Sequence, residues 1–399
     1  MSFEQDNLII KNIPLQDFEI DGSCKANYLG ENLKVFGGLP EEIVDLKVVT
    51  RFDDDLICIV NKVKKPSKFR IEPKCKYYLS CSGCQFQHVD YNNQLAIKKK
   101  FVLNTLKNIK SFSEDKLDNT VESKLIFNYR NHARFSVSKS KKYKGNIGFI
   151  NRWTRKLVEI SNCEIMNSRI NSILLKLKNK LSGYSQFSIR VGTQYDSYLV
   201  QPKITEIDDF ETGQKSYIEV INNIEHQISS PSFFQVNTNQ AERLGEIIRK
   251  NINFKGNEVV IDAFSGVGTF SVLLSKYVKK IYCIESSYSS IKDANYNSKS
   301  LDNLELIHSE VEKLDISYFN DPIDLIILDP SRKGVHKKGL EWVMNLSPPN
   351  LVYVSCDLST LKNDLNTLTN KYSIRKVIPL DMFPQTKHIE CIVTLNKQV

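Results

Sequence analysis

Apolar and polar residues alternate with two different periods along this chain, and the change of period divides it into three parts. Residues 1–63 carry short runs in which every second residue is apolar, separated by turn residues such as Gly37, Gly38 and Pro40. A period of two is typical of β-strands with one buried face. The first part is therefore predicted to be a small β-barrel.

The second part, residues 64–230, mixes both periods. Apolar residues recur every three or four positions in 91–109, which predicts an amphipathic helix. The segments 132–140, 145–152 and 218–229 have the shorter period and are predicted to be strands. We therefore expect a central α+β domain.

The third part, residues 231–399, alternates short apolar runs with longer helical patterns. This order is typical of a mostly parallel sheet with crossover helices. The predicted strands are 259–262, 281–285, 324–329, 351–355 and 388–395, and the predicted helices are 237–252, 270–278 and 289–300.

Four chemically active side chains stand where apolar runs of the third part end. They are Asp262, Glu285, Asp329 and Cys356. Ligands of such sheets bind beyond the carboxyl ends of the parallel strands. We therefore expect these residues to meet at one edge of the sheet.

A small-residue loop follows the first of these strands. It holds Gly266 and Gly268 and leads directly into a predicted helix, and Glu285 lies 23 residues after Asp262. Glycines let a ligand approach the backbone, and an acid at this distance can accept hydrogen bonds from ribose hydroxyls. A lone G-x-G is a weak signal, and an ordinary strand turn is the alternative.

The overall composition favours an anionic partner. The chain has 55 Lys and Arg against 46 Asp and Glu, a net charge of +9, and nucleic acid is the commonest partner of such proteins. It lacks an apolar run long enough for a membrane helix and a signal-peptide pattern, so a cytoplasmic location is expected. No obligate protein partner is evident.

Nine cysteines in a cytoplasmic chain are expected to be ligands, nucleophiles or core residues. Cys75, Cys81 and Cys84 form a close group, and Cys163 can supply a fourth thiol. Four thiolates suit either a [4Fe–4S] cluster or zinc, although a three-plus-one arrangement favours iron–sulfur. Unrelated core cysteines are the alternative. The cysteines expected only to pack are Cys24, Cys58, Cys283 and Cys391.

Five motifs together resemble the RNA uracil-C5 methyltransferases. They are FFQVNTNQ, DAFSGVGTFS, DPSRKG, VSCDLSTL and HIECIVTL, in this order. The resemblance implies a Rossmann-like class I methyltransferase domain with a mixed, mostly parallel sheet. The segment LKVFGGLPEEIVDLKV and the cysteine spacing are similar to those of the subgroup with an N-terminal TRAM domain and a [4Fe–4S] cluster held by Cys75, Cys81, Cys84 and Cys163.

The resemblance also implies roles for single residues. Cys356 is expected to be the nucleophile that adds to C6 of uracil, and Glu390 the base that removes the proton from C5. The expected contacts to S-adenosylmethionine are Gln235, Phe264, Glu285 and Asp329. A thiolate suits this task because it is both a good nucleophile and a workable leaving group.

The chain departs from the family pattern at two places. Ser265 stands where the family has cysteine, and Asp357-Leu358 stands where it has Asn-Pro. Neither change removes a group that the expected chemistry needs.

Residues 127–156 interleave basic and aromatic side chains, and Tyr129 to Phe135 resemble the family segment that lies against RNA. Arginines can hold phosphates and aromatic rings can stack on bases, whereas a solvated strand face is the alternative. Large-subunit 23S ribosomal RNA is the expected substrate, with transfer RNA as the second choice. An RNA-binding scaffold without catalysis is less favoured, because Cys356, Glu390 and Glu285 are all present. A cytosine-C5 enzyme also uses a thiol, but the resemblance in the placement of the thiol and in the DPSRKG and HIEC contexts favours uracil.

Overall fold

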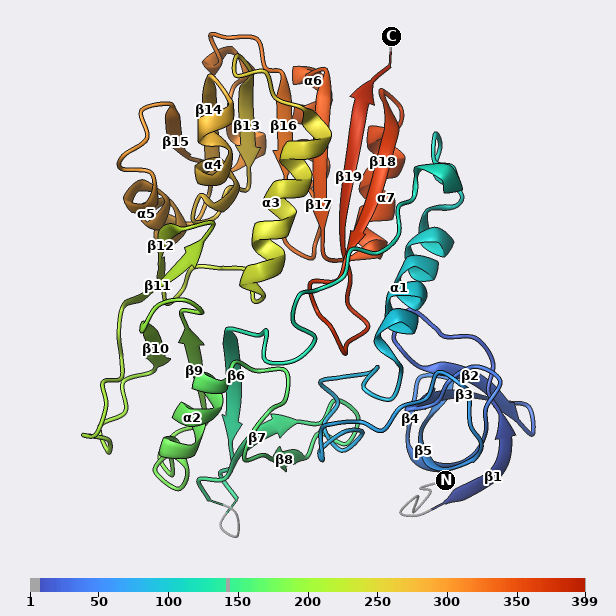
Figure 1. The fold of residues 1–399 in the computed structure, drawn as a ribbon. Coiled ribbons are helices and arrows are strands. Elements are labelled where there is room, and N and C mark those ends of the chain that lie inside the picture. The colour runs from blue at the N-terminus through green and yellow to red at the C-terminus, as the bar shows by residue number, and fades with distance from the viewer. Residues whose placement is uncertain (1–7, 141–143, 399) are drawn as a thin grey trace.

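Two five-stranded sheets, a two-stranded hairpin and a seven-stranded sheet follow one another along the described part of the chain, and the seven-stranded sheet lies above the other two large sheets in Figure 1. The computed structural model describes residues 8–140 and 144–398. Within these ranges, none of the helices is both long and apolar enough to cross a membrane.

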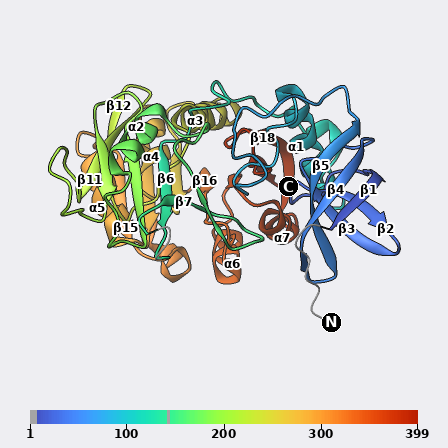
Figure 2. The same ribbon diagram turned by 90° about the horizontal axis from the view of Figure 1, so that it is seen from below.

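The first sheet has five strands in the order β1-β4-β5-β3-β2 and curls into a small barrel-like unit (Figures 1 and 2). Its alternating side chains enclose a core around Leu33, Val35, Val44 and Leu46, as the period of two predicts. The strands are β1 (Ile9–Pro14), β2 (Cys24–Tyr28), β3 (Glu31–Phe36), β4 (Ile43–Phe52) and β5 (Asp55–Lys65).

Helix α1 (Tyr91–Leu106) follows the first sheet, in the segment predicted to be helical. Its buried residues Ile97, Phe101 and Val102 share one core with the third sheet rather than with the central sheet. The chain then passes through a short 3-10 turn, η1 (Glu114–Lys116), and runs beside β18 of the third sheet.

The central sheet is antiparallel, with the order β10-β9-β6-β7-β8, and helix α2 (Ser168–Leu177) packs on it. A separate hairpin, β11–β12, turns at Asn222 and Asn223, which both have positive φ angles as a tight hairpin requires. The strands are β6 (His132–Val137), β7 (Ile147–Ile150), β8 (Leu157–Glu159), β9 (Gln186–Val191), β10 (Tyr198–Gln201), β11 (Ser216–Ile221) and β12 (Ile224–Ser229).

The third sheet has seven strands in the order β15-β14-β13-β16-β17-β19-β18. Its first five strands are parallel, whereas β19 runs antiparallel to both of its neighbours. The expected mixed, mostly parallel sheet is therefore confirmed. The strands are β13 (Val259–Ala263), β14 (Lys280–Glu285), β15 (Leu304–His308), β16 (Leu325–Leu328), β17 (Asn350–Ser355), β18 (Tyr372–Leu380) and β19 (Glu390–Lys397).

Helices cover both faces of the third sheet, so its strands are apolar on both sides. Val259 and Ile261 of β13 face α1, α6 and α7, whereas Val260 faces α3 and α4. The α-helices are α3 (Thr238–Ile252), α4 (Thr269–Leu274), α5 (Tyr288–Asn297), α6 (Lys337–Leu346) and α7 (Leu358–Leu368). Short 3-10 turns are η3 (Ser275–Tyr277), η4 (Val311–Lys313) and η5 (Ile316–Tyr318).

Candidate active site

All ten predicted site residues line one cavity of about 1150 Å³. It opens at the carboxyl edge of the parallel strands, where β13, β14, β16 and β17 end. The cysteine-bearing loop, residues 75–84, and residues of the central sheet also line this cavity. The lining residues predicted from the sequence are Cys75, Cys81, Cys84, Cys163, Gln235, Phe264, Glu285, Asp329, Cys356 and Glu390.

The loop after β13 has the backbone geometry of a ligand cradle. Phe264 has φ of 68°, a left-handed conformation that a bulky residue seldom adopts, and Gly266 has φ of 56°. A Cβ atom at Gly266 would meet nothing within 4 Å, so this glycine is required by its conformation and not by crowding. Such strained positions cluster where a protein binds a ligand.

Glu285 ties this loop to the next strand. Its carboxylate accepts hydrogen bonds from the backbone N–H of Gly266 at 2.9 Å and of Ser287 at 2.6 Å. Gln235 also lines the cavity, and its backbone carbonyl accepts a hydrogen bond from the side-chain amide of Asn131, the residue before β6, at 3.1 Å.

Asp329 directly follows β16 and lines the cavity. Its protein surroundings raise the pKa of the carboxyl from 3.8 to about 7, first through desolvation and then through the nearby Asp262. A carboxyl with this pKa gains or loses its proton near neutral pH, which is a common property of functional sites.

Cys356 and Glu390 meet because of the strand register. Ser355 of β17 pairs with Cys391 of the antiparallel β19. Cys356 follows Ser355 and Glu390 precedes Cys391, so both residues lie at the same end of this strand pair. Burial, and after it the neighbouring Glu390, raises the pKa of the Cys356 thiol to about 12. Burial and Asp329 also raise the pKa of Glu390 well above 4.5. Both groups thus favour their uncharged forms.

Arg332 and His388 are lining residues that the sequence reasoning missed. The Arg332 guanidinium lies near the Cys356 thiol and acts against the increase in the pKa of that thiol. Burial and the cations around His388 lower its pKa to about 4, so the imidazole is neutral at pH 7. Arg332 could have been found from its place in DPSRKG, three residues after Asp329.

The two departures from the family motifs have local explanations. Asp357 is the N-cap of α7, where its carboxylate accepts from the backbone N–H of Ser359 at 3.0 Å and of Thr360 at 3.2 Å. Asparagine caps a helix equally well. Ser265 places its hydroxyl in the interior without a hydrogen-bond partner among the described residues, a position that a cysteine thiol fills at lower cost.

The four thiols predicted to hold a metal lie close to one another. The pKa of the Cys84 thiol is raised by burial and then by the proximity of Cys163, Cys81 and Cys75. Within 8–140 and 144–398, however, no three side chains of His, Cys, Asp or Glu are arranged as a metal-ligand set. The iron–sulfur cluster therefore stays a prediction.

The four cysteines expected to pack, Cys24, Cys58, Cys283 and Cys391, are fully buried.

The basic and aromatic segment needs a correction. Tyr129 and Phe135 are buried, at 2% and 1% exposure, so they are unable to stack on RNA bases. Tyr129 donates to a backbone carbonyl, and Phe135 packs in the core of the central sheet because alternate residues of β6 face inward. Arg130 and Arg134 line the cavity, and their contact with RNA stays a prediction. Residues 141–143 of this segment lie outside the described ranges.

The fold and the site define a class of protein, the Rossmann-like methyltransferases. The model of the tRNA (uracil-5-)-methyltransferase family matches residues 214–398. An RNA methyltransferase of Clostridium acetobutylicum is 30% identical over 86% of each chain, and one of Fusobacterium nucleatum is 29% identical over 98% of each. The crystal structure of Pyrococcus abyssi tRNA (uracil-54, C5)-methyltransferase in complex with S-adenosyl-L-homocysteine has the same fold, with a TM-score of 0.75. The two sequences are 22% identical, and the match covers 96% of this chain and 99% of the Pyrococcus chain.

The chain belongs to the RNA uracil-C5 methyltransferase family and is an S-adenosylmethionine-dependent RNA methyltransferase.

Proposed function

We propose that this enzyme methylates C5 of a uridine by covalent catalysis, with Cys356 as the nucleophile and Glu390 as the base. The observation that carries the proposal is that both groups line the same cavity as the strained Phe264 loop and Glu285. A methyl donor and a pyrimidine ring can therefore meet in one enclosed space.

The thiolate is the nucleophile, so the Cys356 thiol, which burial keeps mostly neutral, must first release its proton to solvent. The Arg332 guanidinium stabilises the thiolate that results. The sulfur then bonds to C6 of uracil, and the electron pair of the C5–C6 double bond moves toward O4, which makes C5 nucleophilic. S-adenosylmethionine, when bound, supplies the methyl group that C5 accepts.

Glu390 completes the reaction. After methylation, C5 still carries its proton. Glu390 must by then have released its own proton to solvent, against the burial that favours its neutral form, and its carboxylate accepts the proton from C5. The electron pair of the broken C–H bond restores the C5–C6 double bond, and the bond between C6 and sulfur breaks. Cys356 leaves as a thiolate, and the enzyme returns to its initial state once this thiolate has regained a proton from solvent.

The methyl donor fits the wall formed by Gln235, Phe264, Glu285 and Asp329. Glu285 already accepts hydrogen bonds from the loop and can also accept from ribose hydroxyls. The backbone of the loop, with left-handed Phe264 and Gly266, would also contact the cofactor.

We infer that the RNA is held by all three parts of the chain. Residues 1–63 would form a TRAM-like RNA-binding domain, 64–230 a central domain with the metal site, and 231–399 the catalytic domain. Arg130 and Arg134 at the cavity offer phosphate contacts.

Large-subunit ribosomal RNA is the proposed substrate, because it is typical of the subgroup with this domain and these cysteines. Transfer RNA is the second candidate, because the similar Pyrococcus enzyme is a tRNA methyltransferase.

Cys75, Cys81, Cys84 and Cys163 would hold a [4Fe–4S] cluster. All four thiols line the same cavity, and soft thiolate ligands suit iron–sulfur chemistry, although the described residues do not form a preformed ligand set. The methyl transfer proposed above needs no electron, so the role of the cluster would be to fix the loop that closes the cavity.

The test is to replace Cys356 with alanine. Methyl transfer from labelled S-adenosylmethionine to RNA from cells lacking the gene should disappear, whereas RNA binding should persist. RNA with 5-fluorouridine at the target should trap the unaltered enzyme as an adduct that survives denaturation, because fluorine is unable to leave as a proton. Cys58→Ala, which changes a buried thiol of the first sheet, is the matched control. Turnover by Cys356→Ala would contradict the mechanism.

A further inference from the structure

The segment between β18 and β19, residues 381–389, is held in place from outside the third sheet. Five consecutive backbone carbonyls, from Asp381 to Gln385, each accept a hydrogen bond from another part of the chain. The donors are Gln240 to Asp381 at 2.9 Å, Asn237 to Met382 at 3.2 Å, Lys98 to Phe383 at 3.0 Å, Tyr129 to Pro384 at 3.1 Å, and the backbone N–H of Gln85 and of Phe86 to Gln385 at 3.1 and 2.9 Å.

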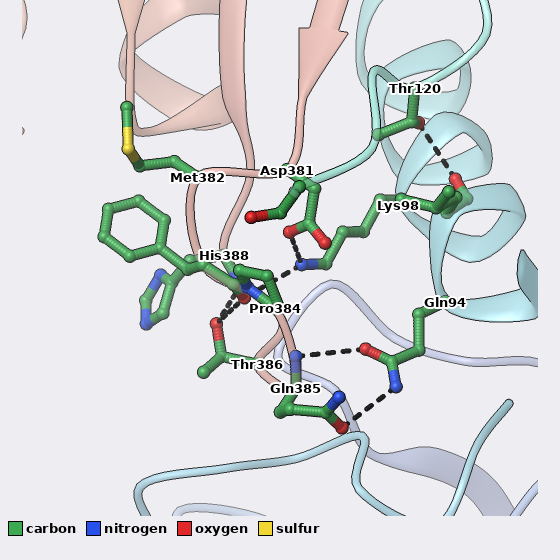
Figure 3. A network of polar contacts seen from close by, with 12 residues as sticks. Gln94, Lys98, Thr120, Asp381, Met382, Pro384, Gln385, Thr386 and His388 are labelled. Carbon is green, nitrogen blue, oxygen red and sulfur yellow. Dashed lines mark hydrogen bonds and ion pairs between the residues drawn. The ribbon is translucent and has the colours of Figure 1, made fainter. Parts of the chain in front are cut away.

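An ion pair without solvent exposure lies at the start of this segment. Lys98 of α1 contacts Asp381 at 2.5 Å, and both side chains are 0% exposed (Figure 3). Tyr91 donates to the second carboxylate oxygen of Asp381 at 2.8 Å. A buried ion pair adds little net stability compared with apolar residues of the same volume, but it fixes one arrangement of its partners.

Gln94 of α1 holds the segment at a second point. Its amide oxygen accepts from the backbone N–H of Gln385 at 3.0 Å, and its amide nitrogen donates to the side chain of Gln385 at 3.1 Å (Figure 3). Gln385 has φ of 70°, a conformation that non-glycine residues adopt only when their surroundings impose it. The bonds from Gln94 supply this constraint.

The anchored segment leads directly to the catalytic base. The Phe383 carbonyl that Lys98 binds also accepts from the Thr386 hydroxyl at 2.8 Å, and this hydroxyl accepts from the N–H of His388 at 3.3 Å (Figure 3). Phe383, Thr386, His388 and Glu390 all line the cavity. A continuous set of contacts therefore joins Lys98 to the residue next but one to Glu390.

We propose that Lys98 and Gln94 are positioning residues for proton removal from C5, acting through residues 381–389 on Glu390. This inference rests on the proposed covalent mechanism. Neither residue lines the cavity, and the hydrogen bonds given above connect both of them to it through the segment. A displacement of about 1 Å of a catalytic group can lower a rate by about 100-fold.

The step that depends on Glu390 can be observed separately from the earlier steps. If proton removal fails, the methylated uracil stays bonded to Cys356, and the enzyme remains attached to ordinary uridine RNA under denaturing conditions. Glu390→Gln is the reference variant for this adduct. The readout is the fraction of enzyme found as the adduct, together with kcat, KM for S-adenosylmethionine and the melting temperature.

Lys98→Met should lower kcat by about 10- to 100-fold, leave KM for S-adenosylmethionine within about twofold, and accumulate the adduct. Gln94→Met should show the same pattern more weakly, and it is the variant to use if Lys98→Met does not fold. Arg70→Met, which breaks the 2.6 Å pair with the buried Glu42, is the matched control. It should lower the melting temperature without adduct.

Two results would overturn the inference. If the Lys98 and Gln94 variants melt earlier but turn over at the normal rate without adduct, these residues are only structural. If Glu390→Gln itself gives no adduct, while the 5-fluorouridine trap also fails, the covalent mechanism is wrong and the inference falls with it. An adduct with Glu390→Gln but not with Lys98→Met would sink the inference alone.

Discussion

Arg332 lies beside Cys356 and is the nearby cation that acts against the increase in the pKa of its thiol, which burial raises to about 12. The reactive thiolate is therefore a minor species at neutral pH. Among the described groups near the thiol, the Arg332 guanidinium is the one that increases the amount of thiolate.

Replacing Arg332 with glutamine should slow every reaction of the Cys356 thiolate. Between pH 6 and 9 the pH is far below the pKa of the Cys356 thiol, so the fraction of thiolate rises about tenfold per pH unit. The rate at which iodoacetamide alkylates Cys356 should rise by the same factor in the original protein and in Arg332→Gln, and the variant should be slower at every pH. Mass spectrometry of the Cys356 peptide measures the rate. Lys333→Gln, a neighbouring exposed cation, is the control, and equal rates for all three proteins would contradict the role of Arg332.

Glu285→Gln should weaken S-adenosyl-L-homocysteine binding by about 10- to 100-fold, because a hydrogen bond to a charged group contributes about 1.5–3 kcal/mol. Calorimetric titration with S-adenosyl-L-homocysteine gives Kd directly. The control is Glu305→Gln on the adjacent β15, whose carboxylate pairs with Lys280 at 2.7 Å outside the cavity. Unchanged affinity in Glu285→Gln would remove this residue from the cofactor site.

Asp357→Ala should lower the free energy of unfolding by about 1 kcal/mol, because it removes the N-cap of α7. Asp357→Asn, which restores the residue typical of the family, should stay within about 0.5 kcal/mol of the original protein, since asparagine caps equally well. Urea denaturation measures both values. Equal losses in the two variants would show that the charge of Asp357, and not its capping bonds, stabilises the helix.

Anaerobic purification should give a brown protein with iron and acid-labile sulfide in equal amounts, and Cys84→Ser should lose both. The matched control is Cys58→Ser, a buried thiol in the first sheet that should leave the metal content unchanged. A colourless protein that holds zinc would replace the cluster assignment with a zinc site.

The sequence was sufficient for most of the elements and for ten of the residues that line the cavity, but the apolar pattern did not predict β15, β18, α6 or α7. Polar groups at the ends of apolar runs, such as Asp329 and Cys356, had to lie at the carboxyl edge of the sheet, because parallel strands place those ends together. The alternation in β6 could also have shown that Phe135 faces the core and Arg134 does not. Local periodicity carries this information because it depends only on neighbours along the chain.

Tertiary structure alone decided which distant residues meet. The helical period of 91–109 places Lys98 on the same face as Ile97, Phe101 and Val102, yet nothing in it indicates Asp381, 283 residues further along. Likewise, the chain order does not show that α1 packs on the third sheet, or that the cysteine-bearing loop closes a cavity formed by strand ends. Such contacts depend on how complete surfaces fit together, so a buried lysine finds its carboxylate only when the whole chain has folded.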